Sequence, residues 1–301
     1  MAEYRRRVEV ELARIRGSAA LTLDDAELDR MRSYFAPPPY DPRATGTLAS
    51  AALDKDRTYA RWVKANVLPH RQPGYAIVQL SLKSPELPPG DVTSDQMDAI
   101  AALADRYAFG RIVVTHRQNL VLCDVAIADL PALHRELVPL ALATPNVGRA
   151  TDLVACPGLD YCDLANARSI PLARAIQERL ETADLVDDVG EVTINVSGCI
   201  NACGHHHVGN IGVLGIDKQG EEFYQVMLGG SHTEEASLGK VLGKSLTADE
   251  VVDGIERVLR AYLAVRHDDE ETFMKALARL GPAPFKEALY AAHPPALQQS
   301  A

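Results

Sequence analysis

The sequence lacks three features that would assign it to a broad class at once. No apolar run approaches the roughly 20 residues that cross a bilayer, and no apolar stretch of a secretory signal follows the charged start. Basic residues are in deficit, since 31 Lys and Arg face 41 Asp and Glu, which gives a net charge of −10. We therefore expect a cytoplasmic protein that binds neither membrane nor nucleic acid, because phosphate contacts need an excess of cations.

The composition that remains is typical of a folded protein. The 301 residues are 47% hydrophobic and 24% charged, with neither an internal repeat nor a low-complexity segment. Domains run to roughly 100–200 residues, so this length suggests about two. Five cysteines are few. In a reducing cytoplasm they are better explained as metal ligands, redox groups or buried apolar residues than as disulfides.

The pattern of apolar residues and turn signals predicts an α+β protein in three parts. Residues 1–57 read as a helical arm or linker, with helices at 3–16 and 24–35 and a stop at three consecutive prolines. Residues 58–145 alternate strand and helix, with strands at 74–83 and 111–122, a capping box at 93–96 and a second helix at 129–140. That order indicates half of a ferredoxin-like unit.

A third part, residues 146–295, carries the chemistry. It is predicted as an α/β domain with a cysteine-bearing loop, a helix at 163–182, a strand at 190–197 and a second cysteine-bearing loop. Strands at 208–216 and 222–228 follow, then a capping box at 247–250 that opens a helix, and a last helix at 269–280.

Four of the five cysteines form two pairs in this third part. Cys156 and Cys162 are spaced C-x5-C, and Cys199 and Cys203 are spaced C-x3-C. Each pair lies on a loop at the end of a predicted element, so one fold can bring both loops together. Four thiolates can hold a [4Fe–4S] cluster, and the wide first spacing departs from the tight knuckles of structural zinc. The spacing favours a cluster, and zinc or buried thiols stay open as alternatives.

At this point the sequence resembles a known family. The stretches ACPGLDYC, SGCINACGHHHVGNIGVLG and YQVMLGGS are similar to the sirohaem-dependent sulfite and nitrite reductases. Upstream, RWVKANVLPHRQPGYAIVQLSLK and VTHRQNLVL resemble the ferredoxin-like half that precedes the cluster domain in that family. The likeness covers about residues 57–290.

The resemblance implies cofactors and roles. The four cysteines would ligate a [4Fe–4S] cluster, Cys203 would also be the axial thiolate of the sirohaem iron, and Asn201 would hydrogen-bond the macrocycle. The implied reaction is the six-electron reduction of sulfite to sulfide or of nitrite to ammonia, with ferredoxin or a flavoprotein reductase as electron donor. The protein would orient the anion and stabilise its charge.

The chain departs from the family pattern in its length. Family members are about twice as long, with two copies of ferredoxin-like half plus larger domain, and this chain resembles the second copy. The first copy normally supplies most of the cations that bind substrate and the sirohaem carboxylates. We therefore expect an N-terminal half or partner subunit, without which the chain would be inactive. A precorrin-3B synthase-like oxygenase and a non-catalytic iron–sulfur electron-transfer subunit are the alternatives.

Three further features of the sequence lie outside the paired cysteine motif. Arg117 and Gln118 lie within a polar triplet of the predicted strand 111–122, and could face the cofactor or be solvated on an edge strand. The histidine run at 205–207 fits structural or near-cluster use better than direct ligation. Cys123 has no partner at metal spacing and is expected to be a buried apolar thiol.

Overall fold

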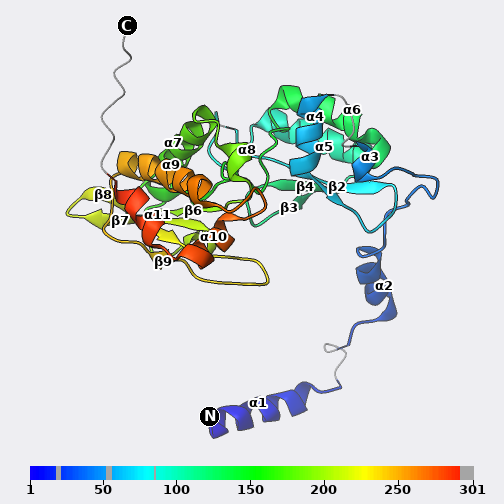
Figure 1. The fold of residues 1–301 in the computed structure, drawn as a ribbon. Helices are drawn as coiled ribbons and strands as arrows, with labels where there is room; N and C mark the ends of the chain where they lie inside the picture. The colour runs from blue at the N-terminus through cyan, green and yellow to red at the C-terminus, as the bar shows by residue number, and fades with distance from the viewer. Residues whose placement is uncertain (18–21, 52–55, 85, 292–301) are drawn as a thin grey trace. The chain divides into compact units, whose positions relative to one another are not determined.

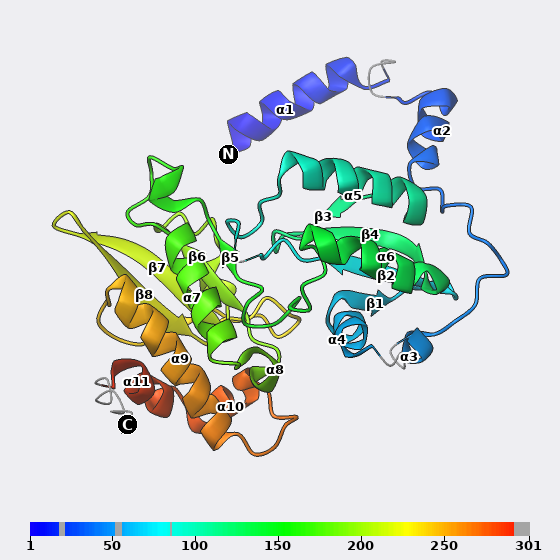
Figure 2. The same ribbon diagram turned by 90° about the horizontal axis from the view of Figure 1, so that it is seen from above.

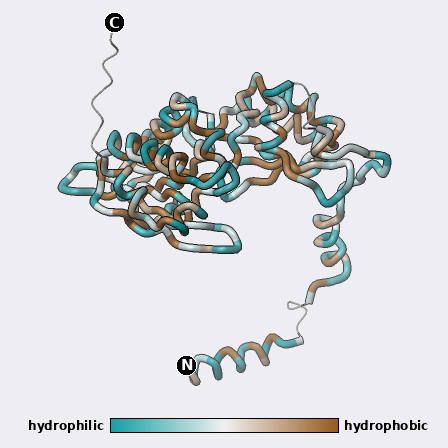
Figure 3. Tube along the Cα trace, viewed as in Figure 1, coloured by the Kyte–Doolittle hydropathy of each residue, from teal (hydrophilic) through white to brown (hydrophobic). Residues whose placement is uncertain are grey.

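The computed structural model describes residues 1–17, 22–51, 56–84 and 86–291. Contacts divide the chain into two compact units, Met1–Arg43 and Ala44–Ala301. The first unit holds α1 (Ala2–Ile15) and α2 (Asp25–Ser33), which are labelled in Figure 1. Neither helix buries a residue, and α1 alternates hydrophilic and hydrophobic positions along its trace (Figure 3). The two helices predicted for the arm are therefore present.

The second unit begins with a four-stranded antiparallel sheet in the order β1-β2-β4-β3. Its strands are β1 (Val67–Pro69), β2 (Tyr75–Leu80), β3 (Val113–Val114) and β4 (Leu120–Ala126). The accompanying helices are α3 (Leu48–Ala51), α4 (Arg57–Asn66), α5 (Ser94–Tyr107) and α6 (Leu130–Leu137).

One face of this sheet is covered by α4, α5 and α6 (Figure 1). Alternate residues of β2 and β4, such as Val78 and Leu122, meet Trp62, Leu103 and Leu133 of the three helices in one buried core. The predicted capping box forms at the start of α5, where Thr93 and Gln96 bind each other's backbone. The ferredoxin-like half is thus a half-covered sheet, as its alternating strands predict.

The predicted continuous strand over residues 111–122 is wrong. The structure forms a hairpin there, in which β3 and β4 flank a turn that contains Arg117 and Gln118. Thr115 Oγ1 accepts the backbone N–H groups of Arg117 (3.3 Å) and Asn119 (3.1 Å), and Gln118 has a left-handed φ of 58°. Local side-chain bonding therefore reverses the chain where the apolar flanks suggest extension.

The remaining strands form a mixed five-stranded sheet in the order β5-β6-β7-β8-β9. They are β5 (Val154–Ala155), β6 (Ile194–Ser197), β7 (Ile211–Lys218), β8 (Glu221–Leu228) and β9 (Lys240–Val241). Strands β5, β6 and β7 are parallel, whereas β7, β8 and β9 are antiparallel. Because β5 and β6 are parallel neighbours, the loops that leave them begin at the same edge of the sheet.

Helices pack against this sheet on the side that buries Ile194 and Val196 of β6. They are α7 (Ile170–Thr182), α8 (Val186–Val189), α9 (Ala248–Val265), α10 (Phe273–Leu280) and α11 (Ala283–Tyr290). Figure 2 shows α7 and α9 running side by side across the strands. Within the described ranges, no helix is long and apolar enough to cross a membrane.

Candidate cofactor site

The two loops that carry the cysteine pairs leave neighbouring strands at one edge of the mixed sheet. Cys156 follows β5 directly, and Cys199 follows β6, whose Asn195 and Val196 pair with Val154 and Ala155 of β5. Cys156 and Cys199 are buried, Cys162 is half-buried and Cys203 is exposed. The predicted convergence of the two loops is therefore present in the fold.

Backbone hydrogen bonds tie the first cysteine loop to the second. The N–H of Gly198 donates to Sγ of Cys156 at 3.1 Å. In return, the carbonyl of Gly198 accepts the N–H groups of Asn166 (2.8 Å) and Ala167 (3.0 Å), which lie just beyond Cys162. Hydrogen bonds to the ligand sulfurs are one of the ways in which proteins tune iron–sulfur clusters, and this N–H supplies one.

The segment that carries Cys203 runs back across the sheet on the face opposite α7 and α9. On β6, Ile194 and Val196 point into the helix-covered core, so Asn195 and Ser197 point the other way. Asn195 Nδ2 donates to the carbonyls of Gly204 (3.0 Å) and His205 (3.2 Å), and Ser197 Oγ accepts the N–H of Gly204 (3.1 Å). Two polar side chains of one strand thus fix the chain beside Cys203.

The return path also requires a glycine on β7. A Cβ at Gly212 would lie 2.1 Å from the carbonyl oxygen of His206, closer than real Cβ atoms approach. His206 begins a single 3₁₀ turn, His206–Val208, that packs against β6 and β7. The absence of a side chain at Gly212 therefore allows the segment after Cys203 to lie directly on the sheet.

His206 is a buried polar group that the protein leaves unsatisfied. Its exposed fraction is 0%, and among the described residues neither ring nitrogen has a hydrogen-bond partner. Burial, together with the adjacent His207 ring whose centroid is 3.9 Å away, lowers the pKa of His206 to about 4. A buried ring N–H without a partner, three residues beyond Cys203, is a donor that a bound group can satisfy.

The structure brings Gln118 to the cysteine edge but places Arg117 elsewhere. Gln118 exchanges two hydrogen bonds with the backbone of Ala155, the residue before Cys156. Arg117 binds Asp152 and lines a cavity of about 460 Å³, together with His232. Thr193, which precedes β6, also lines this cavity, so the cavity lies at the opposite end of β6 from Cys199.

The other side chains singled out from the sequence have separate surroundings. Asn201 is exposed, and its side chain has no hydrogen bond within the described part of the chain. Cys123 is half-buried on β4 rather than fully buried, and burial beside Asp124 raises the pKa of its thiol. Sequence reasoning missed Asn195 and Ser197, although their alternation with Ile194 and Val196 was a readable signal.

The residues present fit an iron–sulfur cluster. Four cysteines from two joined loops supply the thiolates, Gly198 supplies an N–H to sulfur, and buried His206 leaves a donor to be satisfied. Across the described ranges, no three His, Cys, Asp or Glu side chains gather closely enough to hold a metal ion between them. The thiolates of a four-iron cluster bind different irons and are spread more widely than the ligands of one ion.

These features define an α+β protein with a thiolate site at one edge of a mixed sheet. Two family models match the chain: the nitrite/sulfite reductase ferredoxin-like half domain over residues 69–140, and the nitrite and sulphite reductase 4Fe-4S domain over residues 149–294. The chain belongs to the nitrite and sulfite reductase family, whose cofactors are a [4Fe–4S] cluster and sirohaem.

Named relatives and solved structures agree with this membership. The chain is 29% identical to a ferredoxin–nitrite reductase of Synechococcus elongatus over 79% of its own length and 44% of that protein. It is 34% identical to sulfite reductase [ferredoxin] 2 of Mycolicibacterium paratuberculosis, over 60% of this chain and 34% of that protein. The structure of the Mycobacterium tuberculosis NirA protein matches with a TM-score of 0.60 at 28% identity, over 72% of this chain and 42% of that one. The chain therefore spans less than half the length of these relatives.

Proposed function

We propose that this chain carries the cluster- and sirohaem-binding part of an enzyme that reduces nitrite or sulfite by six electrons. The observation that supports this most directly is the hydrogen bond from Gly198 to Sγ of Cys156, because it joins the two cysteine loops at one edge of the sheet. Ferredoxin, which the names of both relatives contain, is the proposed electron donor.

In this proposal Cys156, Cys162, Cys199 and Cys203 hold the cluster. When bound, the cluster and sirohaem supply stored electrons and an iron that binds the anion. Cys203 is the exposed member of the four, which suits a thiolate that also faces a second cofactor. Asn201 is exposed on the same loop, and its proposed role is to hydrogen-bond the macrocycle. The thiols of Cys156 and Cys199 are buried, so these two proposed ligands are shielded from water.

Arg117 and Gln118 are assigned different parts. Gln118 fixes the backbone just before Cys156, whereas Arg117 brings positive charge to the cavity that it shares with His232, Asn210 and Ser231. The guanidinium of Arg117 is the group there that can bind a carboxylate or a small oxyanion, against the charges of Glu191 and Glu235, which also line the cavity, and of its partner Asp152. The relatives are longer than this chain. We propose that the part they have in addition supplies further cations for the anion.

The test compares serine variants of the four cysteines with C123S, which changes a thiol outside both pairs. After anaerobic incubation with iron and sulfide, the wild-type chain and C123S should bind about four irons each and show a cluster EPR signal on reduction. Each of C156S, C162S, C199S and C203S should bind less iron or give an altered signal.

Activity is then measured on the full gene product loaded with both cofactors, using reduced ferredoxin and either nitrite or sulfite. Ammonia or sulfide should form at the same rate in C123S as in the wild type, and C203S should form neither. A wild-type chain that takes up no more iron than C156S would overturn the proposal.

A further inference from the structure

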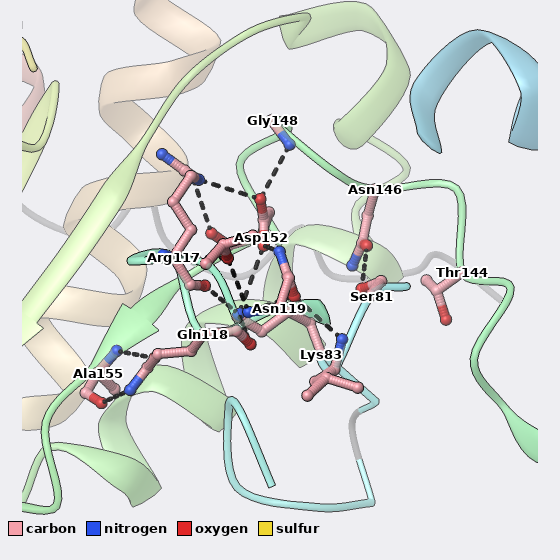
Figure 4. Close-up of polar contacts among 12 residues, drawn as sticks. Ser81, Lys83, Arg117, Gln118, Asn119, Thr144, Asn146, Gly148, Asp152 and Ala155 are labelled. Atoms are coloured by element: carbon pink, nitrogen blue, oxygen red, sulfur yellow. Dashed lines mark hydrogen bonds and ion pairs between the residues drawn. The ribbon is translucent and has the colours of Figure 1, made fainter. Parts of the chain in front are cut away.

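A completely buried lysine lies between the ferredoxin-like half and the strand that leads to Cys156. Lys83 has an exposed fraction of 0% and follows β2. Its Nζ donates to the carbonyls of Arg117 (2.7 Å) and Gln118 (3.0 Å) and lies 3.5 Å from Oδ1 of Asp152 (Figure 4). A buried ammonium is tolerated only when it is paired and hydrogen-bonded, and these contacts meet both conditions.

Asp152 is also 0% exposed, and its carboxylate contacts Lys83, the β3–β4 turn and the loop at Gly148. It accepts from Asn119 Nδ2 (2.9 Å), from the N–H of Gly148 (2.9 Å) and from Arg117 Nε (3.3 Å), as Figure 4 shows. Its segment enters β5 two residues later, and Cys156 follows β5. Asp152 therefore joins the β3–β4 turn to the segment that leads through β5 to Cys156, a proposed cluster ligand.

The turn also contacts the residue before that ligand. Gln118 Nε2 donates to the carbonyl of Ala155 (2.7 Å), and the N–H of Ala155 donates to Gln118 Oε1 (3.1 Å). β5 is a two-residue strand at the edge of its sheet. The Gln118 side chain bonds the N–H and carbonyl groups of Ala155 as a neighbouring strand would. Gln118 adopts its left-handed φ where Lys83 binds the turn's carbonyls, so Lys83 stabilises the conformation that presents Gln118 to Ala155.

These contacts determine geometry more than they add stability. Burial lowers the pKa of Lys83 to about 8, against the opposing effect of Asp152, so the side chain stays charged at neutral pH. A buried ion pair often contributes little net stability compared with apolar residues of the same volume, although removing one partner is costly. Apolar residues could not supply the directed hydrogen bonds that fix the Lys83 segment, the β3–β4 turn and the Asp152 segment in one arrangement.

We propose that Lys83 and Asp152 form a latch that holds the β3–β4 turn against β5 and so sets the position of the Cys156 thiolate. Both are positioning residues, because neither is accessible to substrate. This inference rests on the proposed cluster at Cys156. A third element adds to the latch, since Gln177 Nε2 of α7 donates to the carbonyl of Lys83 at 2.7 Å.

The experiment uses three variants and one matched control on the cluster-loaded protein. K83M removes the charge and its donors at similar length. K83M/D152N removes both charges of the pair but keeps an oxygen that accepts hydrogen bonds from Asn119 and Gly148, and Q118A removes only the contact with Ala155. The control, S81A, removes the hydrogen bond from Ser81 Oγ to Asn146 Oδ1 (2.6 Å), which joins nearby segments outside the path to Cys156. Loss of iron to a chelator, the cluster EPR spectrum and the melting temperature are measured for each.

K83M and Q118A should lose iron about tenfold faster than S81A, the factor that corresponds to roughly 1.4 kcal/mol, and should show a shifted EPR spectrum. K83M/D152N should recover part of the melting temperature lost in K83M, because the second substitution balances the lost charge and its amide Oδ1 still accepts hydrogen bonds, but should keep the fast iron loss and the altered spectrum. Recovery of all three properties together, or iron loss in Q118A equal to that in S81A, would show that the pair is only structural.

Amide hydrogen exchange separates this inference from the proposed function, because it needs no cofactor. In the apo chain, the N–H of Ala155 should exchange about tenfold faster in Q118A and K83M than in S81A. Faster exchange supports the latch even if the wild type binds no cluster, and unchanged exchange overturns it. If K83M does not fold, Q118A alone decides the outcome, since it leaves the buried charges paired.

Discussion

The N–H of Gly198 donates to Sγ of Cys156 at 3.1 Å, across 42 residues of sequence. This contact requires the backbone of Gly198 to lie against the first cysteine loop. A Cβ at Gly198 would lie 2.5 Å from the carbonyl oxygen of Ala167, so no other residue fits without moving one loop. The two halves of the proposed cluster site are therefore held together through a position that only glycine can occupy.

We expect G198A to separate the loops and to reduce the iron bound after reconstitution to less than half of the wild-type value. The added methyl group must displace the backbone at Ala167, which overpacking data suggest costs about 1–3 kcal/mol. Iron content and the urea midpoint measure both effects. G220A is the control. A side chain at Gly220 is strained by the φ of +88°, but its Cβ would meet no atom within 4 Å and so would not move a loop. Equal iron loss in both variants would contradict the argument.

Much of the fold could be predicted because its signals are local. The capping boxes at Thr93 and Thr247 mark the starts of α5 and α9, and both form as the sequence indicates. The second cysteine pair follows the predicted strand 190–197, present as β6, whereas β5, before the first pair, was not predicted. The predicted features depend on residues within a few positions of one another, which is the range over which sequence patterns are informative.

The β3–β4 turn and the latch could not be predicted because their causes are distant in sequence. Apolar residues flank Arg117 and Gln118, so the segment reads as one strand, and the bonds from Lys83 that support the turn come from 34 and 35 residues away. Likewise, nothing near Asp152 in the sequence indicates that its carboxylate accepts hydrogen bonds from Asn119 and Arg117. Polar groups buried in long-range pairs are visible only once the chain is folded.

Replacing Asn195 should loosen the segment that carries Cys203. N195A leaves the carbonyls of Gly204 and His205 without their donor in a buried site, which should lower the free energy of unfolding by about 1–3 kcal/mol and speed iron loss. N210A is the matched control, because Asn210 makes similar bonds to Thr193 and Gly230 at the other end of β6. It should cost similar stability in urea while iron is retained. Iron loss from N210A at the same rate would show that stability alone governs retention.

Acid should destabilise the apo protein through His206. Its pKa is about 4 in the folded state, below the ordinary value of 6.5, so between these values the unfolded chain binds a proton that the folded chain does not. The free energy of unfolding should therefore fall as pH drops from 6.5 to 4, by up to about 3 kcal/mol. Urea unfolding at several pH values measures this.

His206→Leu should reduce that pH dependence, because the buried titratable ring is gone, while His134 and His232, whose pKa values burial also lowers, keep a smaller contribution. The exposed His116 provides the control, and H116L should keep the wild-type slope. If H206L retains the full loss of stability between pH 6.5 and pH 4, another group is responsible and the assignment to His206 is wrong.

Asn201 should affect sirohaem without affecting the cluster. Its exposed amide makes no side-chain hydrogen bond within the described residues, so N201A removes nothing on which the folded chain depends. If the amide binds the macrocycle, N201A in the full gene product should bind iron and sulfide normally and weaken sirohaem binding by about tenfold, as expected for one lost hydrogen bond. Spectrophotometric titration of the cluster-loaded protein with sirohaem measures the affinity. N166A, which changes an exposed asparagine on the first cysteine loop, should leave it unchanged, and an equal loss in both variants would remove the special role of Asn201.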